Sequence, residues 1–171
     1  MSHQHHSLQS DQDALSTRTP SLETVQTYVH IATQWEEQDR ILKSIEALQK
    51  AKEINSTLSE AETEDIAIHI ECALGSHWRT LGKYKRSFAH YKNHLKLHEK
   101  KHLEKPHIQI ALAHFYLAGL YESVWRLDPA IHHYEHAVAI SAVILQPNDP
   151  NLIHLKKQAA AAKNLRTGAP N

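Results

Sequence analysis

The stretch LGSHWRTLGKYKRSFAHY, residues 74–91, carries the pattern that decides the fold. An apolar residue precedes the small Gly75, and an aromatic residue, Trp78, follows three positions later. After a break that contains glycine come a second small residue, Ser87, and a large one four positions on, Tyr91. Residues three or four apart lie on one face of a helix, and a small side chain there lets a neighbouring helix approach closely. The stretch therefore predicts a helical hairpin.

The same pattern occurs three times at a spacing of 43 residues, and the three copies align without a gap. Self-similarity at a fixed period indicates a repeat architecture, in which each unit buries its apolar face against the next. The superposed positions are Ala32, Gly75 and Ala118; Trp35, Trp78 and Tyr121; Ser44, Ser87 and Ala130; Leu48, Tyr91 and Tyr134; and Ile54, Leu97 and Ile140.

Turn and capping residues divide the chain into three hairpins and a last helix. We expect Asp39, the step at residues 80–82 and Asp128-Pro129 to separate the two helices of each hairpin. The repeats then cover about residues 20–58, 59–103 and 104–146. Their first helices are opened by Thr19-Pro20, by a capping box of Ser59 with Glu62, and by Lys105-Pro106.

The two ends of the chain differ in character. Residues 150–166, opened by Asp149-Pro150, place leucine and alanine, including Leu165, against lysine, which predicts a helix that caps an open-ended stack. Residues 1–19 are rich in Ser, Gln, His and Asp, so we expect a disordered tail there, and a short flexible tail at 167–171.

Composition agrees with an all-α domain. Four glycines and six prolines among 171 residues suit one helical domain, and the formal net charge of zero provides no global field toward nucleic acid or a membrane. A single cysteine fits a reducing compartment. No apolar run approaches the roughly 20 residues that span a bilayer, and the first residues contain no apolar signal core. We therefore expect a cytoplasmic protein.

These residues carry a family resemblance. LGSHW followed by LGKY and SFAHY resembles the tetratricopeptide (TPR) signature W-x2-L-G-x2-Y, then A-x3-F. The period of 43 rather than 34 is similar to the longer repeats of kinesin light chains, and the resemblance covers about residues 21–166. It implies a right-handed superhelical stack of three antiparallel hairpins with a C-terminal capping helix. The first signature position departs from tryptophan in every copy, holding Tyr28, Glu71 and His114.

The resemblance also implies a function, the binding of a peptide or helical segment of another protein in a concave groove lined by first helices. Our working hypothesis is a mixed apolar and polar segment, anchored at Leu112 and Phe115, with Arg79 pairing an acid. The groove positions carried over from the family are Gln26, Val29, Thr33, Glu36, His69, Cys72, Ser76, Arg79, Leu112, Phe115, Gly119, Glu122 and Gln158.

Nothing in the sequence assembles an active site, so we expect no enzyme and no cofactor. Cys72 lies near His69 and His77 in sequence, but a small groove-lining residue is a better interpretation than a thiolate nucleophile. Glu36, Glu37 and Asp39 could form a paired-carboxylate site, but they close a helix and are better interpreted as solvated.

A histidine ladder, His90, His94, His98 and His102, repeats every four residues. Imidazoles four apart on a helix can chelate a divalent metal, but no acid or cysteine completes a set here and the lysines between them repel cations. A helix face that is partly packed and partly solvated is the preferred interpretation. A metal- or pH-responsive regulator stays open as an alternative, since histidine changes charge near pH 6–7.

Charge is strongly patterned although its sum is zero. Residues 36–71 hold ten acids and four bases, whereas residues 79–105 hold nine bases and two acids. The basic block favours an acidic partner over nucleic acid, because two of its three aromatic residues, Tyr84, Phe88 and Tyr91, fall on packing positions. A small secretion or assembly chaperone of the TPR type remains the runner-up function, and an uncovered outer face would allow two copies to pair.

Overall fold

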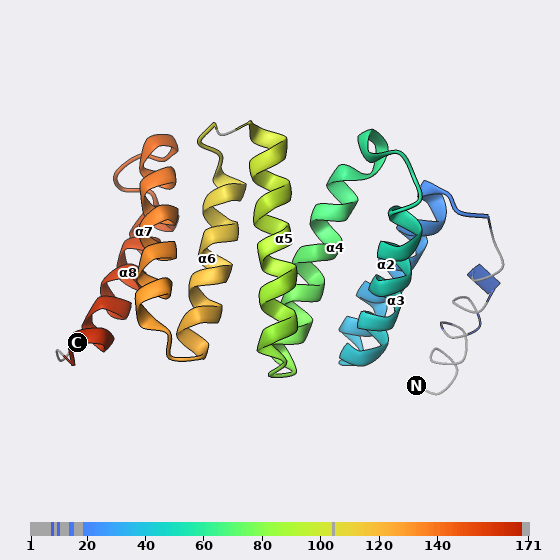
Figure 1. Cartoon of the computed structure of the whole chain (residues 1–171), viewed down its shortest axis with the longest axis horizontal. Coiled ribbons are helices and arrows are strands. Elements are labelled where there is room, and N and C mark those ends of the chain that lie inside the picture. Colours follow the sequence, from blue (N-terminus) through green and yellow to red (C-terminus); the bar gives the residue numbers. More distant parts are fainter. Residues whose placement is uncertain (1–7, 9, 11–13, 16–18, 104, 169–171) are drawn as a thin grey trace. The chain divides into compact units, whose positions relative to one another are not determined.

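The computed structural model describes residues 8, 10, 14, 15, 19–103 and 105–168, and these contain helices and no strand (Figure 1). The all-α fold class, with helical hairpins and a C-terminal capping helix, is confirmed. The helices are α2 (Leu22–Glu37), α3 (Ile41–Asn55), α4 (Glu60–Thr80), α5 (Tyr84–His102), α6 (Ile108–Ser123), α7 (Leu127–Ile144) and α8 (Pro150–Thr167).

The chain divides into two compact units, residues 1–77 and residues 78–171, and α4 runs from the first into the second. Most of the expected disordered tail at 1–19, and residues 169–171 of the expected C-terminal tail, lie outside the described residues. Of the four described residues before position 19, Leu8 and Leu15 are buried, and Leu15 lines a small pocket beside Tyr28.

The turn inside each hairpin has the same backbone geometry. One residue with a left-handed conformation ends each first helix, and the amide of the next residue bonds back to the carbonyl of the repeat aromatic, as at a helix C-terminus of the Schellman type. The period of 43 residues is therefore present in the backbone itself. The left-handed residues are Asp39 (φ 56°), Gly82 (φ 67°) and Trp125 (φ 56°), followed by the bonds Arg40 N to Trp35 O (2.8 Å), Lys83 N to Trp78 O (2.8 Å) and Arg126 N to Tyr121 O (2.9 Å).

The predicted break at Asp128-Pro129 is displaced by a few residues. The turn centres on Trp125, and Arg126 is the N-cap of α7, so Asp128 and Pro129 lie in the first helical turn. Proline is tolerated there because the first amides of a helix have no intrahelical partner. By contrast, Asp149-Pro150 forms the expected cap and first residue, since the Asp149 carboxylate accepts the Asn151 amide at 2.8 Å.

In the unit of residues 1–77, the small repeat residues lie at the contact between helices. Ala32 of α2 and Ser44 of α3 are almost fully buried, which permits close helix approach. Ser44 Oγ also lies 2.9 Å from His77 Nε2 on α4, so the small residue provides a buried polar contact to the next helix. A second link joins these helices where Lys52 Nζ meets Glu71 Oε1 at 2.6 Å.

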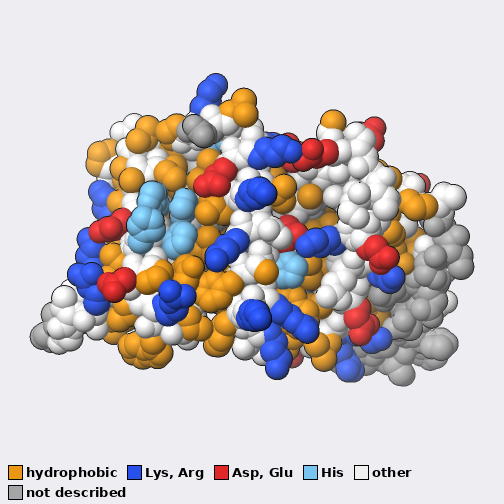
Figure 2. Space-filling model, in the orientation of Figure 1, with side chains coloured by type: hydrophobic (Ala, Val, Ile, Leu, Met, Phe, Trp, Pro, Cys, Tyr) orange, Lys and Arg blue, Asp and Glu red, His pale blue; other side chains and the backbone are white. Residues whose placement is uncertain are grey.

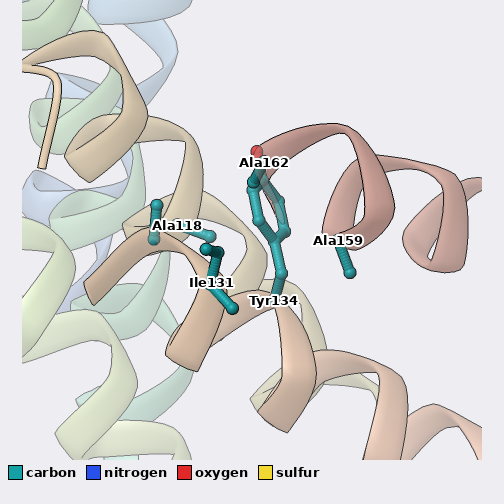
Figure 3. Packing of buried hydrophobic residues seen from close by; sticks show 6 residues of the cluster. Ala118, Ile131, Tyr134, Ala159 and Ala162 are labelled. Carbon is teal, nitrogen blue, oxygen red and sulfur yellow. The ribbon is translucent and has the colours of Figure 1, made fainter. Parts of the chain in front are cut away.

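In the unit of residues 78–171, α6 and α7 form an antiparallel pair and α8 packs beside α7 (Figure 1). Figure 3 shows Tyr134 extending from α7 toward α8, where Ala159 and Ala162 leave room for its ring. The small residues thus accommodate the large repeat aromatic, as the pattern predicts. Leu165 departs from the expected apolar face, because it is 44% exposed.

Candidate functional site

A pocket of about 550 Å³ opens in the unit of residues 78–171. It is lined by five of the six predicted groove residues of this unit, contributed by the end of α4 and by α6 and α8. The sixth, Leu112, does not line it. The full lining consists of Arg79, Phe115, Tyr116, Gly119, Glu122, Ser123, Trp125, Leu127, Tyr134, Gln158 and Leu165.

Gly119 leaves open space within the lining of the pocket. An added Cβ would find only Tyr134 Oη nearby, at 3.8 Å, so the space above the α6 backbone is open. Phe115, one turn earlier, is partly buried and packs its ring 5.8 Å from that of Tyr134. The missing side chain and the aromatic wall together form a hollow that can accept an apolar side chain.

Charged groups of both signs border the hollow. The Tyr134 hydroxyl donates a 2.8 Å hydrogen bond to Glu122 Oε2, which fixes the carboxylate against the pocket wall. Burial, followed by this bond and the Glu122 charge, raises the pKa of Tyr134 well above its usual value, and the nearby Arg79 charge opposes the rise. Arg79 is exposed and belongs to the lining. The pocket therefore offers a cation and an anion around an apolar centre.

The other predicted groove residues belong to the unit of residues 1–77. Val29 and Cys72 are partly buried, whereas Gln26 and His69 are exposed. Thr33 uses its hydroxyl within the helix, donating to the Val29 carbonyl at 3.2 Å. Glu36 is exposed and lies 3.9 Å from His77 Nε2, and Ser76 is half-buried on α4.

Burial keeps the potentially reactive side chains of this unit, Cys72 and His77, in their neutral forms. Burial raises the pKa of the Cys72 thiol, which disfavours the thiolate that a nucleophile requires. Burial also lowers the pKa of His77, and the Glu36 charge offsets only part of that effect. A neutral His77 suits its contact with Ser44, because a neutral imidazole can exchange one hydrogen bond with a hydroxyl.

The histidine ladder is partly buried. His94 and His98 are 4% and 5% exposed, while His90 and His102 are half-buried. The His94 and His98 rings meet edge to face at 4.6 Å, and His102 stacks both on His98, at 5.8 Å, and on His107, at 3.5 Å. Burial, and then the neighbouring imidazoles and Lys101, lower the pKa of His98 to about 4. The buried rings of the ladder are therefore packing groups, and His98 remains neutral at pH 7.

A second histidine cluster joins α6 to α7 and was missed by sequence reasoning. His114 Nδ1 lies 2.8 Å from His133 Nδ1, and His132 and His136 complete the group. Figure 2 shows histidine side chains gathered on the surface over α6 and α7. The departure from tryptophan at His114 was the available signal, because a histidine at a packing position needs a polar partner.

Among the residues that the structure describes, no group of three or more His, Cys, Asp or Glu side chains is arranged to hold a metal ion. Likewise, none of the described helices combines the length and apolar character needed to cross a bilayer.

Comparison with solved structures assigns the fold. BtubC (BKLC) from P. vanneervenii is 22% identical with a TM-score of 0.76, and the match covers 92% of this chain and 64% of that one. This chain thus spans just under two thirds of that structure. A putative kinesin light chain from Podosopora anserina with nearly identical TPR-like repeats is 17% identical, with a TM-score of 0.73 over 97% of this chain and 83% of that one. A variant of that protein with a single substitution gives the same values.

The chain has a TPR-like helical repeat fold. No family model and no curated protein sequence matches it. The TPR-like hairpins of this chain carry the left-handed turn residue and the small-to-large packing in all three copies. The repeat pattern fixes the packed positions, whereas the residue types at the pocket positions differ between the copies.

Proposed function

We propose that this chain is a non-enzymatic protein-interaction module that binds a segment of a partner protein in the pocket around Phe115 and Gly119. One observation carries the proposal: residues from α4, α6 and α8, selected by repeat position alone, converge on one pocket of about 550 Å³. Its lining combines the charged Arg79 and Glu122 with the aromatic rings of Phe115 and Tyr134. Such a surface complements a segment with one apolar anchor and flanking charged side chains.

The expected binding mode follows from the pocket. An apolar side chain of the partner fills the space above Gly119 and contacts Phe115. A partner acid pairs with exposed Arg79, whereas Glu122 is already oriented by Tyr134 and accepts a donor from the segment. The apolar anchor supplies most of the affinity, since exposed ion pairs contribute about 0–1 kcal/mol each.

The test selects peptides from a displayed library on the full chain and measures their affinity for matched variants. Gly119→Leu fills the pocket and Phe115→Ala removes its wall, so each is expected to raise the Kd about tenfold or more. Leu112→Ala is the control, because Leu112 lies on the same helix but does not line the pocket. If Leu112→Ala weakened binding as much as Gly119→Leu, this pocket would not be the binding site.

A further inference from the structure

A second pocket, of about 470 Å³, lies in the same unit and shares no residue with the first. It is formed by the first turns of α5, the end of α6 and the N-cap of α7. Three of its residues are cations and two are aromatic. The lining, which we call the basic pocket, consists of Lys85, Phe88, Ala89, Lys92, Tyr121 and Arg126.

The cations of the basic pocket have no carboxylate partner among the described residues. Two acids lie close in sequence, and both are engaged elsewhere. Glu122 accepts the Tyr134 hydroxyl at 2.8 Å, and Asp128 Oδ1 accepts a bond from Arg166 at 3.1 Å. Three exposed positive charges therefore remain available to an anion that enters the pocket.

The floor of the pocket is apolar and already ordered. The rings of Phe88 and Tyr121 lie 4.6 Å apart, and the Arg126 guanidinium lies over Tyr121 at 5.4 Å from its centroid. His133 stacks on Tyr121 at 5.4 Å with nearly parallel rings. With His133 and Arg126 against Tyr121, the ring is poorly placed for base stacking, while the floor can still contact an aliphatic side chain.

His133, which stacks on the Tyr121 ring of this floor, is also influenced by the charge of Lys92. Burial, and then the charges of His132, His136 and Lys92, lower the pKa of His133 to about 4. Lys92 is thus close enough to disfavour a second positive charge at His133. An anion bound beside Lys92 would relieve that repulsion.

We propose that the basic pocket is a second docking site, which binds an acidic segment of a partner protein. The carboxylates of the segment pair with Lys85, Lys92 and Arg126, and an apolar side chain beside them contacts Phe88 and Tyr121. The combination of clustered cations with an ordered apolar floor favours this occupant over a polyanion without apolar groups. Figure 2 shows Lys and Arg side chains beside hydrophobic surface, next to the histidine patch.

The test uses the full chain and a short fluorescein-labelled peptide in which pairs of Glu flank a central Leu. Its affinity is measured by fluorescence anisotropy beside that of a peptide with Gln in place of Glu. The pocket variant is Lys85→Gln with Lys92→Gln. Its matched control is Lys156→Gln with Lys157→Gln on α8, which removes the same charge from exposed positions outside the pocket. Circular dichroism checks that both variants fold.

We expect the pocket variant to raise the Kd of the acidic peptide about tenfold, and the control to change it less than about twofold. The same tenfold effect is expected in the Gly119→Leu background, in which the site around Gly119 is filled, and this separates the basic pocket from that site. Equal losses in pocket and control variants, or no binding of the Glu peptide, would overturn the proposal. Tighter binding of a single-stranded oligonucleotide, or of a second copy of the chain detected by sedimentation, with the same sensitivity to Lys85 and Lys92 would overturn it in favour of that occupant.

Discussion

Protonation of the histidine cluster between α6 and α7 should destabilise the protein in mild acid. His114 is 9% exposed, and burial, followed by the charges of His133, His136 and His132, lowers its pKa from 6.5 to about 4. No carboxylate is among these causes. Between pH 4 and pH 6.5 the unfolded state binds more protons at His114 than the folded state does. The contribution of the neutral His114 to the free energy of unfolding is therefore complete above pH 6.5 and is lost as the pH falls toward 4.

One histidine with this pKa shift lowers the free energy of unfolding by about 2 kcal/mol between pH 7 and pH 5. His98 and His133 have their pKa lowered similarly, so the wild-type protein is expected to lose more than that amount. Urea unfolding followed by circular dichroism at both pH values measures the loss. In His114→Gln the loss should be about 2 kcal/mol smaller, because the proton-binding group is gone.

The control for this experiment is His30→Gln. His30 is an exposed histidine of α2 that lies outside the cluster between α6 and α7. We therefore expect this variant to keep the wild-type pH dependence. If His114→Gln lost as much stability between pH 7 and pH 5 as wild type, burial of neutral imidazoles would not be the cause of acid sensitivity.

Three further substitutions test the packing. Gly119→Ala should stabilise the folded protein by about 0.5–1 kcal/mol in thermal unfolding, because the added Cβ meets only Tyr134 Oη, at 3.8 Å. A lower Tm would show that the pocket wall closes on Gly119. Trp125→Gly should stabilise the folded protein by about 1 kcal/mol, because glycine adopts the left-handed conformation without strain. An unchanged or lower Tm would mean that contacts of the exposed indole stabilise the fold. Ser44→Ala should cost about 1–3 kcal/mol because it leaves the buried His77 Nε2 without its partner, and a neutral result would show that the contact contributes little.

The repeat fold was predictable because three copies of one pattern constrain each other. The left-handed turn at Gly82 is predictable because glycine favours this conformation, and Asp39 is a residue type that tolerates it. Trp125 gives no such signal, since a bulky residue rarely takes this conformation. Residue preferences therefore placed the third turn at Asp128-Pro129, whereas the period of 43 applied to Gly82 points to Trp125.

The pocket was predictable only in part. Repeat position identifies which residues of the first helices point away from the packed face, and Arg79, Phe115 and Gly119 follow from it. The contribution of Tyr134 does not follow, because its repeat position marks a packing residue. Its hydroxyl nevertheless lies next to the open space at Gly119, and Tyr134 lines the pocket. The exposure of Leu165 depends on where α8 meets α7, which the periodicity of α8 alone does not fix.

A basic residue at the same position of every hairpin needs an explanation other than helix stability. Arg40, Lys83 and Arg126 are the N-caps of α3, α5 and α7, and none makes a side-chain capping bond. A positive charge at a helix N-terminus is unfavourable by about 0.3–1 kcal/mol, and Ser, Thr, Asp or Asn would stabilise the helix better. Lys83→Gln should therefore raise the stability slightly and leave the affinity for the acidic peptide unchanged.

Arg126→Gln should behave differently if the basic pocket binds acidic segments. The favourable removal of charge from the N-terminus of α7 is offset by loss of the guanidinium contact with Tyr121, so stability should change by less than about 0.5 kcal/mol. Affinity for the Glu peptide should nevertheless fall about fivefold, because one of three cations is lost. Urea unfolding and anisotropy on the same preparations separate the two effects. A loss of stability above about 1 kcal/mol with unchanged peptide affinity would assign Arg126 a purely structural role.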